Sequence, residues 1–200
     1  KEALNVTDCS FLHIVWVKER SQTIADDMPL YDHIRLAKAF CKAQRVYGAE
    51  SYIGGVSGHV LDILVIHYGG FMPFVTAVSQ WKEQTVLDPE GHYSSDTEIL
   101  AQLNEAKTTS PLIIVDPIDK TRNAAAALRS DMYDKLKRVC NAFIDDPSED
   151  AFILTPVTVD NWGPPKDEII ALSMQPFKGK KDVVGAKMYK VFQYVVQQCQ

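Results

Sequence analysis

Residues 54–68, GGVSGHVLDILVIHY, decide the fold. The glycines at the start predict a turn, because glycine accepts backbone conformations that other residues avoid. Residues 59–68 are apolar nearly all round, which is typical of a helix buried on every side. Gly69-Gly70 ends that helix, and a second apolar helix is expected over 71–81, with Pro73 in its first turn, where proline is tolerated. These two helices are the expected centre of the core.

The segments around this centre predict an α+β fold. Helices are expected at 11–19, 31–45, 131–144 and 182–197, with a further helix starting at 124–129 and a short one near 97–105 inside a polar excursion over 82–110. Residues 51–53 are expected to be extended, and strands are expected at 112–115 and 169–174. Helices come first and are later mixed with a few strands, which favours a helical central domain followed by a mixed α/β body. The boundary is expected near Ser110.

Composition excludes several classes of protein. The 200 residues are 46% hydrophobic and 24% charged, which excludes general disorder. The 21 Lys and Arg against 26 Asp and Glu give a net charge of −5, so nucleic acid could be bound only through a local basic face. No apolar run reaches the ~20 residues of a membrane span. The chain begins without Met, and we expect it to be a piece of a longer protein.

The cysteines indicate the cellular compartment in which the protein works. Cys9, Cys41, Cys140 and Cys199 form no CxxC pair and match no zinc-site spacing. Scattered thiols of this kind favour a reducing cytoplasm, and a secreted protein with two disulfides is the alternative.

A basic stripe lies on the helix expected at 31–45. Arg35, Lys38, Lys42 and Arg45 follow steps of three, four and three, which place four cations on one face. The stripe is either a phosphate-binding face, with Lys38 or Lys42 reaching a triphosphate or an RNA backbone, or a solvated surface. Tyr47, directly after it, has a phenol that can donate to phosphate.

Two loops leave a similar choice open. The turn 54–58 precedes a helix and either cradles an anion through backbone N–H groups or packs closely against a neighbour. The loop 116–123 follows the strand at 112–115 and carries Arg122. That arginine either reads a base edge or holds phosphate, or it is neutralised by Asp116 or Asp119.

Spacing offers no catalytic or metal centre. Asp116 and Asp119 are three residues apart with a proline between them, which does not suit a pair of carboxylates converging on metal ions. The five histidines show no ligand spacing, and His59 and His67 are expected to be satisfied core groups. The residues alone therefore predict binding surfaces without a catalytic centre.

Several of these segments, in this order, resemble the archaeal-type (class I) tRNA CCA-adding nucleotidyltransferases. The family's Asp-Arg-Ser/Thr-Pro-hydrophobic-His pattern is similar to 8–13, DCSFLH, and its Val-Arg-Leu-Leu-Lys-x-Phe helix is similar to 34–40, IRLAKAF. The family's Gly-Val-Tyr-Gly-Ala-Glu and Gly-Gly-Phe-Ser-Gly-Tyr-Leu are similar to 45–50 and 54–60, and its Val-Asp-Pro-Val-Asp-Pro-x-Arg-Asn is similar to 115–123, VDPIDKTRN. The resemblance spans nearly the whole chain.

The resemblance implies roles for particular residues. Those placed around the sugar and triphosphate of the incoming nucleotide are Ser10, His13, Lys38 and Tyr47, while Arg122 helps to read the base edge of ATP or CTP. Further contacts to RNA or phosphate are expected from Arg35, Lys42, Arg45, Ser57 and Asn123. The resemblance implies no catalytic or metal-ligating residue in this chain.

The resemblance also implies a function. Residues 1–13 would be the last strip of a catalytic head, 14–110 the central helical domain and 111–200 the body. The Mg²⁺ ions belong to the head, which would be supplied in cis or in trans, and the partners are ATP, CTP and the tRNA acceptor stem, without a membrane. The expected activity is CCA addition to tRNA 3′ ends in the cytoplasm. The alternative is a non-catalytic nucleotidyltransferase-like scaffold for RNA or ribonucleoprotein assembly.

Overall fold

A computed structural model describes residues 6–22, 24–25, 27–103, 108–156, 158, 173–176 and 178–199, without the side chains of 6–10, 24–25 and 181. The elements, in chain order, are α1 (Val6–Arg20), β1 (Ile24–Ala25), β2 (Met28–Pro29), α2 (Leu30–Ala43), α3 (Gly58–Tyr68), α4 (Phe71–Ser79), β3 (Thr85–Leu87), α5 (Asp96–Gln102), β4 (Leu112–Ile114), α7 (Ser130–Asp145), the short 3₁₀ helix η1 (Glu149–Phe152) and α8 (Lys181–Gln198). The fold class is α+β, as predicted.

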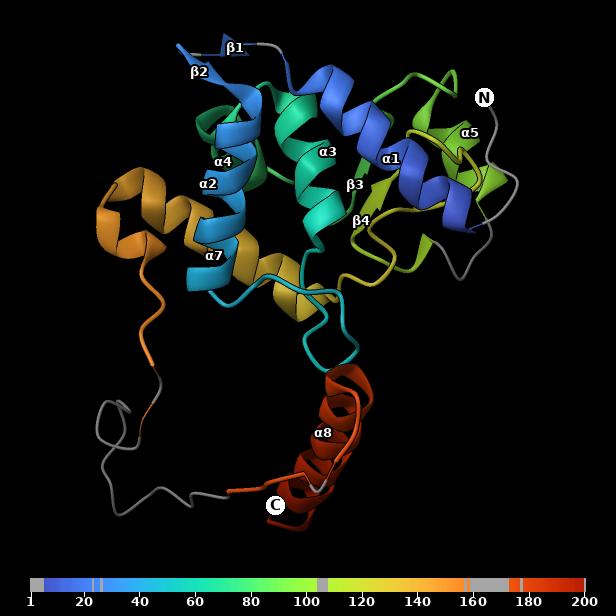
Figure 1. The fold of residues 1–200 in the computed structure, drawn as a ribbon. Helices are drawn as coiled ribbons and strands as arrows, with labels where there is room; N and C mark the ends of the chain where they lie inside the picture. The colour runs from blue at the N-terminus through green and yellow to red at the C-terminus, as the bar shows by residue number, and fades with distance from the viewer. Residues whose placement is uncertain are drawn as a thin grey trace.

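Helix α3 lies at the centre of the helical core, with α1 and α2 beside it (Figure 1). The Ser57 hydroxyl accepts the Val60 N–H and caps its start, and Gly69 ends it in the left-handed conformation at φ 81°. The chain then turns by 97° into α4. The expectation of two buried apolar helices around 54–81 is confirmed. Among the described helices, none is by itself long and apolar enough to cross a membrane.

An aromatic cluster ties the flanking helices together. Phe40 of α2, Phe71 of α4, Phe143 of α7 and Phe152 of η1 contact one another with ring centroids 5.3–5.8 Å apart. Offset and edge-on ring pairs at such distances stabilise a core beyond the area they bury. Segments more than a hundred residues apart in sequence therefore share one core.

Strand β3 was not predicted. It pairs in parallel with β4, with Thr85 opposite Leu112 and Leu87 opposite Ile114. Its three residues lie in a polar segment that looked like an excursion, so their pairing is visible only in three dimensions. The β3–β4 pair and the hydrophobic core both contain residues from before and after residue 110, where the domain boundary was expected. The division into head strip, central domain and body stays a prediction.

Four local expectations need correction or fall outside the description. Residues 51–53 and 124–127 form turns instead of an extended segment and a helix. The second differs because Ala124 N–H donates to the Ile114 carbonyl and Ala125 N–H to Asn123 Oδ1, which holds the backbone beside β4. Helix α2 ends at Ala43 instead of Arg45. Of the strand expected at 169–174, residues 169–172 lie outside the described residues, and 173–174 are not in a strand.

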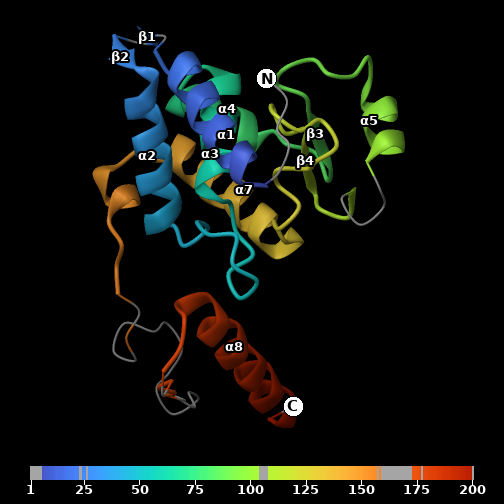
Figure 2. The ribbon, with the colours of Figure 1, turned by 45° about the vertical axis from the view of Figure 1, so that its right-hand side comes forward.

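Helix α8 lies apart from the other helices in both views (Figure 2). The Arg129 guanidinium lies over the Tyr189 ring, 5.9 Å from its centroid, and a side chain at Gly185 would collide with the Tyr52 ring. The expected closing helix is thus present, and it contacts the rest of the chain through the turns around Tyr52 and Arg129.

Candidate functional site

The first turn of α3 is the meeting point of two predicted site residues. A Cβ atom added at Gly58 would lie 2.7 Å from Tyr47 Oη and 3.7 Å from Lys38 Cε. The lysine stem therefore reaches the start of α3 from α2, and the phenol reaches it from the segment that follows α2. A helix N-terminus favours negative charge because its free N–H groups point outward. Lys38 and Tyr47 thus converge at a place suited to an anion.

Lys38 is held by a neighbour on α3. Its Nζ lies 2.6 Å from Asp62 Oδ1. Burial raises the pKa of Asp62, and the hydrogen bond and charge of Lys38 act against that rise. The Lys42 ammonium stays exposed, 4.9 Å from the centroid of the Tyr47 ring. An incoming anion would compete with Asp62 for the Lys38 ammonium.

The other two cations of the predicted stripe diverge from this place. Arg35 pairs with Asp32 at 2.9 Å on the exposed side of α2. Arg45 lies beyond the helix end at φ 56°, and its guanidinium donates to the Thr155 carbonyl at 2.7 Å. The expectation of one stripe of four was wrong for Arg45, because the left-handed residue that ends α2 turns the chain away.

The loop after β4 supplies the second half of the site. Asp116 is fully buried, and its Oδ1 accepts from His13 Nε2 at 2.7 Å and from the N–H groups of Ile118 and Asp119 at 2.9 and 3.2 Å. Burial by itself would raise the pKa of Asp116, but the His13 hydrogen bond and the backbone donors outweigh it and lower that pKa. The ionised carboxylate therefore fixes His13 of α1 beside this loop.

Arg122 lies at the end of the same loop. Its side chain is 48% exposed, and Nη1 lies 3.7 Å from Asp116 Oδ2. Arg122 N–H donates to the Asp119 carbonyl, and its own carbonyl accepts from Asp116 N–H. The guanidinium is thus near a buried carboxylate but about half open to solvent. It extends from a loop and not from the first turn of a helix.

His59 lies between the two halves. Its ring centroid is 4.0 Å from that of His13, and its Nε2 is 3.9 Å from Asp116 Oδ2. Burial, followed by the nearby His13, lowers the pKa of His59 to about 4, and the charges of Arg122 and Lys38 act in the same direction. The expectation that His59 and His67 are satisfied core groups was wrong. The buried His59 Nε2 has no hydrogen-bond partner in the described part of the chain, and His67 is exposed on α3.

Comparison with protein families matches residues 32–153 to the family described as "tRNA nucleotidyltransferase, second domain". The match covers more than half of the chain and includes Lys38, Tyr47, His59 and Arg122. The chain belongs to this tRNA nucleotidyltransferase family.

Curated relatives of this chain are CCA-adding enzymes. The one from Nanoarchaeum equitans is 44% identical over 123 residues, which are 62% of this chain and 30% of that enzyme. Those from Thermococcus kodakarensis and Aeropyrum pernix are 32% and 35% identical over 78% and 76% of this chain, which are 33% and 31% of the enzymes. The chain spans about a third of the length of the relatives it matches.

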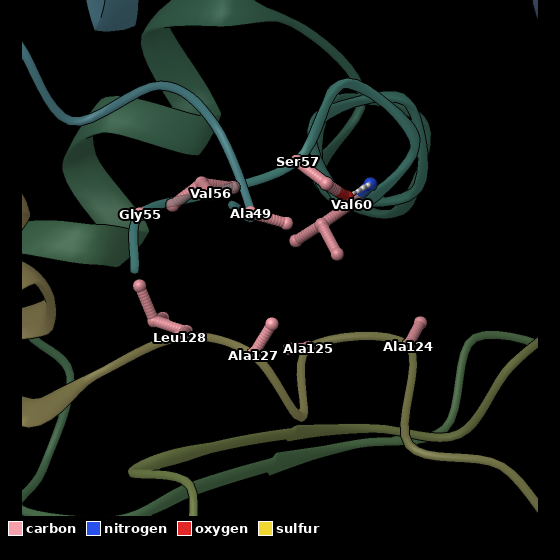
Figure 3. A pocket seen from close by; sticks show the side chains of 9 residues that line it. All are labelled: Ala49, Gly55, Val56, Ser57, Val60, Ala124, Ala125, Ala127 and Leu128. Atoms are coloured by element: carbon pink, nitrogen blue, oxygen red, sulfur yellow. Dashed lines mark hydrogen bonds between the residues drawn. The ribbon is translucent and has the colours of Figure 1, made fainter. Parts of the chain in front are cut away.

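The glycine-rich turn over residues 54–58 is packed closely. Figure 3 shows it facing the turn that contains Ala124 and Leu128, and the cavity between them has a volume of about 10 Å³, enough for a single water. A Cβ at Gly55 would lie 2.2 Å from the Val46 carbonyl oxygen. Of the two readings of this turn, close packing accounts for Gly55, and Ser57 serves as the cap of α3.

The remaining predicted residues differ in accessibility. Asn123 is buried, and its amide accepts from Ile114 N–H and donates to the Leu112 carbonyl, so it holds β4 to its loop. Ser10 lies in α1, but its side chain is outside the described residues. His13 and His59 line an open cavity of about 680 Å³ with Tyr31 and other residues, and Arg122 lines another of about 320 Å³.

The residues that the structure describes do not form a site suited to Mg²⁺, the metal ion expected for a CCA-adding enzyme. The cluster able to converge on a metal ion consists of His13, His59 and Asp116. Mg²⁺ prefers oxygen ligands in near-octahedral geometry, and this set is rich in nitrogen. Sequence spacing missed the cluster because its members come from α1, α3 and the loop after β4. In the sequence, the available signal for this cluster was a histidine, His59, directly after the glycine-rich turn.

Proposed function

We propose that this chain is the part of a CCA-adding tRNA nucleotidyltransferase that holds the incoming CTP or ATP and the tRNA acceptor end. The observation that carries the proposal is the meeting of Lys38 and Tyr47 at the first turn of α3, with His13 and Arg122 gathered around Asp116 beside it. These groups come from four separate segments. The CCA-adding enzymes among its relatives support the same assignment.

The chemistry divides between the two halves of the site. The Lys38 ammonium, the Tyr47 phenol and the α3 N-terminus suit a triphosphate, which carries several negative oxygens. The Arg122 guanidinium has a planar fork of donors that can read acceptor atoms on a base edge. His13, fixed by Asp116, would contact the triphosphate or sugar from the opposite side. These contacts position the nucleotide, and phosphoryl transfer needs positioning and charge neutralisation above all.

The reaction would be completed by residues outside this chain. We propose that a catalytic head, in cis or in trans, supplies the carboxylates and Mg²⁺ ions, and that the assembly works in the cytoplasm, where the buried thiols of Cys41 and Cys140 stay reduced. The alternative is a scaffold that binds RNA without catalysis.

A chimera tests the proposal. The matching region of the Nanoarchaeum equitans CCA-adding enzyme is replaced with that of this chain, and incorporation of CTP and ATP into tRNA lacking CCA is measured. We expect the chimera to add nucleotides. Arg122→Ala is expected to loosen nucleotide choice more than it weakens tRNA binding, while Lys120→Ala, a change of an exposed neighbour in the same loop, leaves both unchanged.

Two results would count against the proposal. A folded chimera that binds tRNA but incorporates no nucleotide would favour the scaffold. Equal loss of nucleotide choice and tRNA binding in Arg122→Ala would show that this guanidinium does not read the base.

A further inference from the structure

Two buried polar atoms face each other without a hydrogen bond where α3 meets the loop after β4. They are His59 Nε2 and Asp116 Oδ2, 3.9 Å apart. A buried polar atom without a hydrogen-bond partner destabilises the folded state, so two at one place call for an explanation. His13 Nε2 lies beside them, 2.7 Å from Asp116 Oδ1, and the three side chains offer ligand atoms that all lie within 4.8 Å of one another.

We propose that His13, His59 and Asp116 bind a divalent transition-metal ion of the zinc class. Two imidazole nitrogens and one carboxylate oxygen are a ligand set that suits Zn²⁺, Co²⁺ and similar ions. The set differs from the carboxylates that hold Mg²⁺ for nucleotidyl transfer. The site goes beyond the proposed function and does not rest on it.

The distances suit such an ion after small side-chain movements. Zinc ligands at about 2.0–2.2 Å in tetrahedral geometry lie roughly 3.4 Å from one another. The distance from His13 Nε2 to Asp116 Oδ1 is 2.7 Å and that from His59 Nε2 to Asp116 Oδ2 is 3.9 Å, and these two values bracket 3.4 Å. The His13 nitrogen would exchange its hydrogen bond to Asp116 for the metal, and His59 would approach by a fraction of an ångström.

The surroundings of the carboxylate favour a cation. Asp116 is fully buried, and its Oδ2 faces His59 Nε2 without a hydrogen-bond partner in the described part of the chain. The backbone N–H groups of Ile118 and Asp119 fix that carboxylate from behind, as the outer partners of metal ligands commonly do.

Two cations lie near the site. The Arg122 guanidinium is 3.7 Å from Asp116 Oδ2, but its side chain is 48% exposed and can turn toward solvent. The Lys38 ammonium is paired with Asp62. His13 and His59 also line the open cavity of about 680 Å³. A water or an anionic oxygen from that cavity would complete the coordination.

Cobalt binding by the full chain tests the site. The chain is first freed of metal with a chelator, and Co²⁺ is added while visible absorbance is recorded, because low-coordinate Co²⁺ absorbs strongly there. We expect saturation at one ion per chain, displacement by Zn²⁺ and a higher Tm with Zn²⁺, since an ion that binds the folded state stabilises it. His59→Gln and His13→Gln should each weaken binding at least tenfold.

A matched control lies on the same helix. His67→Gln changes an exposed histidine two turns further along α3 and should leave Co²⁺ binding unchanged. Cys199→Ser should also leave it unchanged, because Cys199 is an exposed free thiol outside the cluster. Circular dichroism checks that each variant is folded. If His59→Gln does not fold, His13→Gln carries the test.

Three results would overturn the metal site: no saturable visible absorbance, equal affinity in the folded His59→Gln or His13→Gln variant and the wild type, or absorbance lost with Cys199→Ser. The proposed function fails separately, because it is tested by CTP and ATP incorporation in the chimera without added Zn²⁺ or Co²⁺. Nucleotide incorporation by the chimera, together with no Co²⁺ binding by the chain, would retain the proposed function and lose the metal site.

Discussion

Replacing Asp116 with alanine removes an acceptor shared by α1 and the loop after β4. In the wild type Oδ1 accepts from His13 Nε2 and from the N–H groups of Ile118 and Asp119, and the side chain is fully buried. A hydrogen bond to a charged group contributes about 1.5–3 kcal/mol, so losing the three that Asp116 Oδ1 accepts should cost at least about 3 kcal/mol in total. We expect Asp116→Ala to lower the free energy of unfolding by that amount and the Tm on the order of 10 °C, at roughly 2–4 °C per kcal/mol.

The assay is denaturant unfolding followed by circular dichroism at pH 7, in the presence of a chelator. Asp119→Ala is the matched control, because the Asp119 carboxylate is near the surface and accepts from Thr121 in its own loop. The control should lose less than about 1 kcal/mol. A double-mutant cycle with His13→Ala should give a coupling of about 1–2 kcal/mol.

The reasoning is refuted if Asp116→Ala and Asp119→Ala lose the same free energy, or if the cycle with His13→Ala shows no coupling. Either result would mean that the buried carboxylate does not hold α1 to the loop, and that His13 is positioned by packing alone.

Three further predictions concern the surroundings of α3. Because the pKa of His59 is about 4 in the folded chain and about 6.5 when unfolded, the unfolded state binds more protons between these values. Stability should therefore fall by up to about 3 kcal/mol as pH drops from 6.5 to 4, less so in His59→Gln, as measured by denaturant unfolding. Gly58→Ala should displace Tyr47 and raise the KM for CTP and ATP several-fold in the incorporation assay of the chimera, while stability changes by no more than about 1 kcal/mol. Gly55→Ala should cost at least about 2 kcal/mol in the same unfolding assay, because its Cβ meets the Val46 carbonyl.

The fold could be predicted where the pattern is local and long. The helices α3 and α4 were found from their nearly continuous apolar runs between glycines. The helices α2, α7 and α8 were found from their patterns, because a helix buries a face that repeats every 3.6 residues. Strand β3 was missed, since three residues carry too little periodicity. The helix expected from 124 was wrong, because Asn123 and β4 hold the backbone of the alanines that follow, and this tertiary contact outweighs their helix propensity.

The candidate site shows the same division. The sequence by itself determined which chemical groups are present: an ammonium on α2, the phenol of Tyr47 directly after it and a guanidinium in the loop that follows β4. Only the tertiary structure decided that Lys38 and Tyr47 meet at Gly58, that Arg45 turns away, and that His13, His59 and Asp116 lie together. The physical reason is that spacing along one helix or strand reports neighbours within that element, whereas the distance between segments a hundred residues apart is set by how their cores pack.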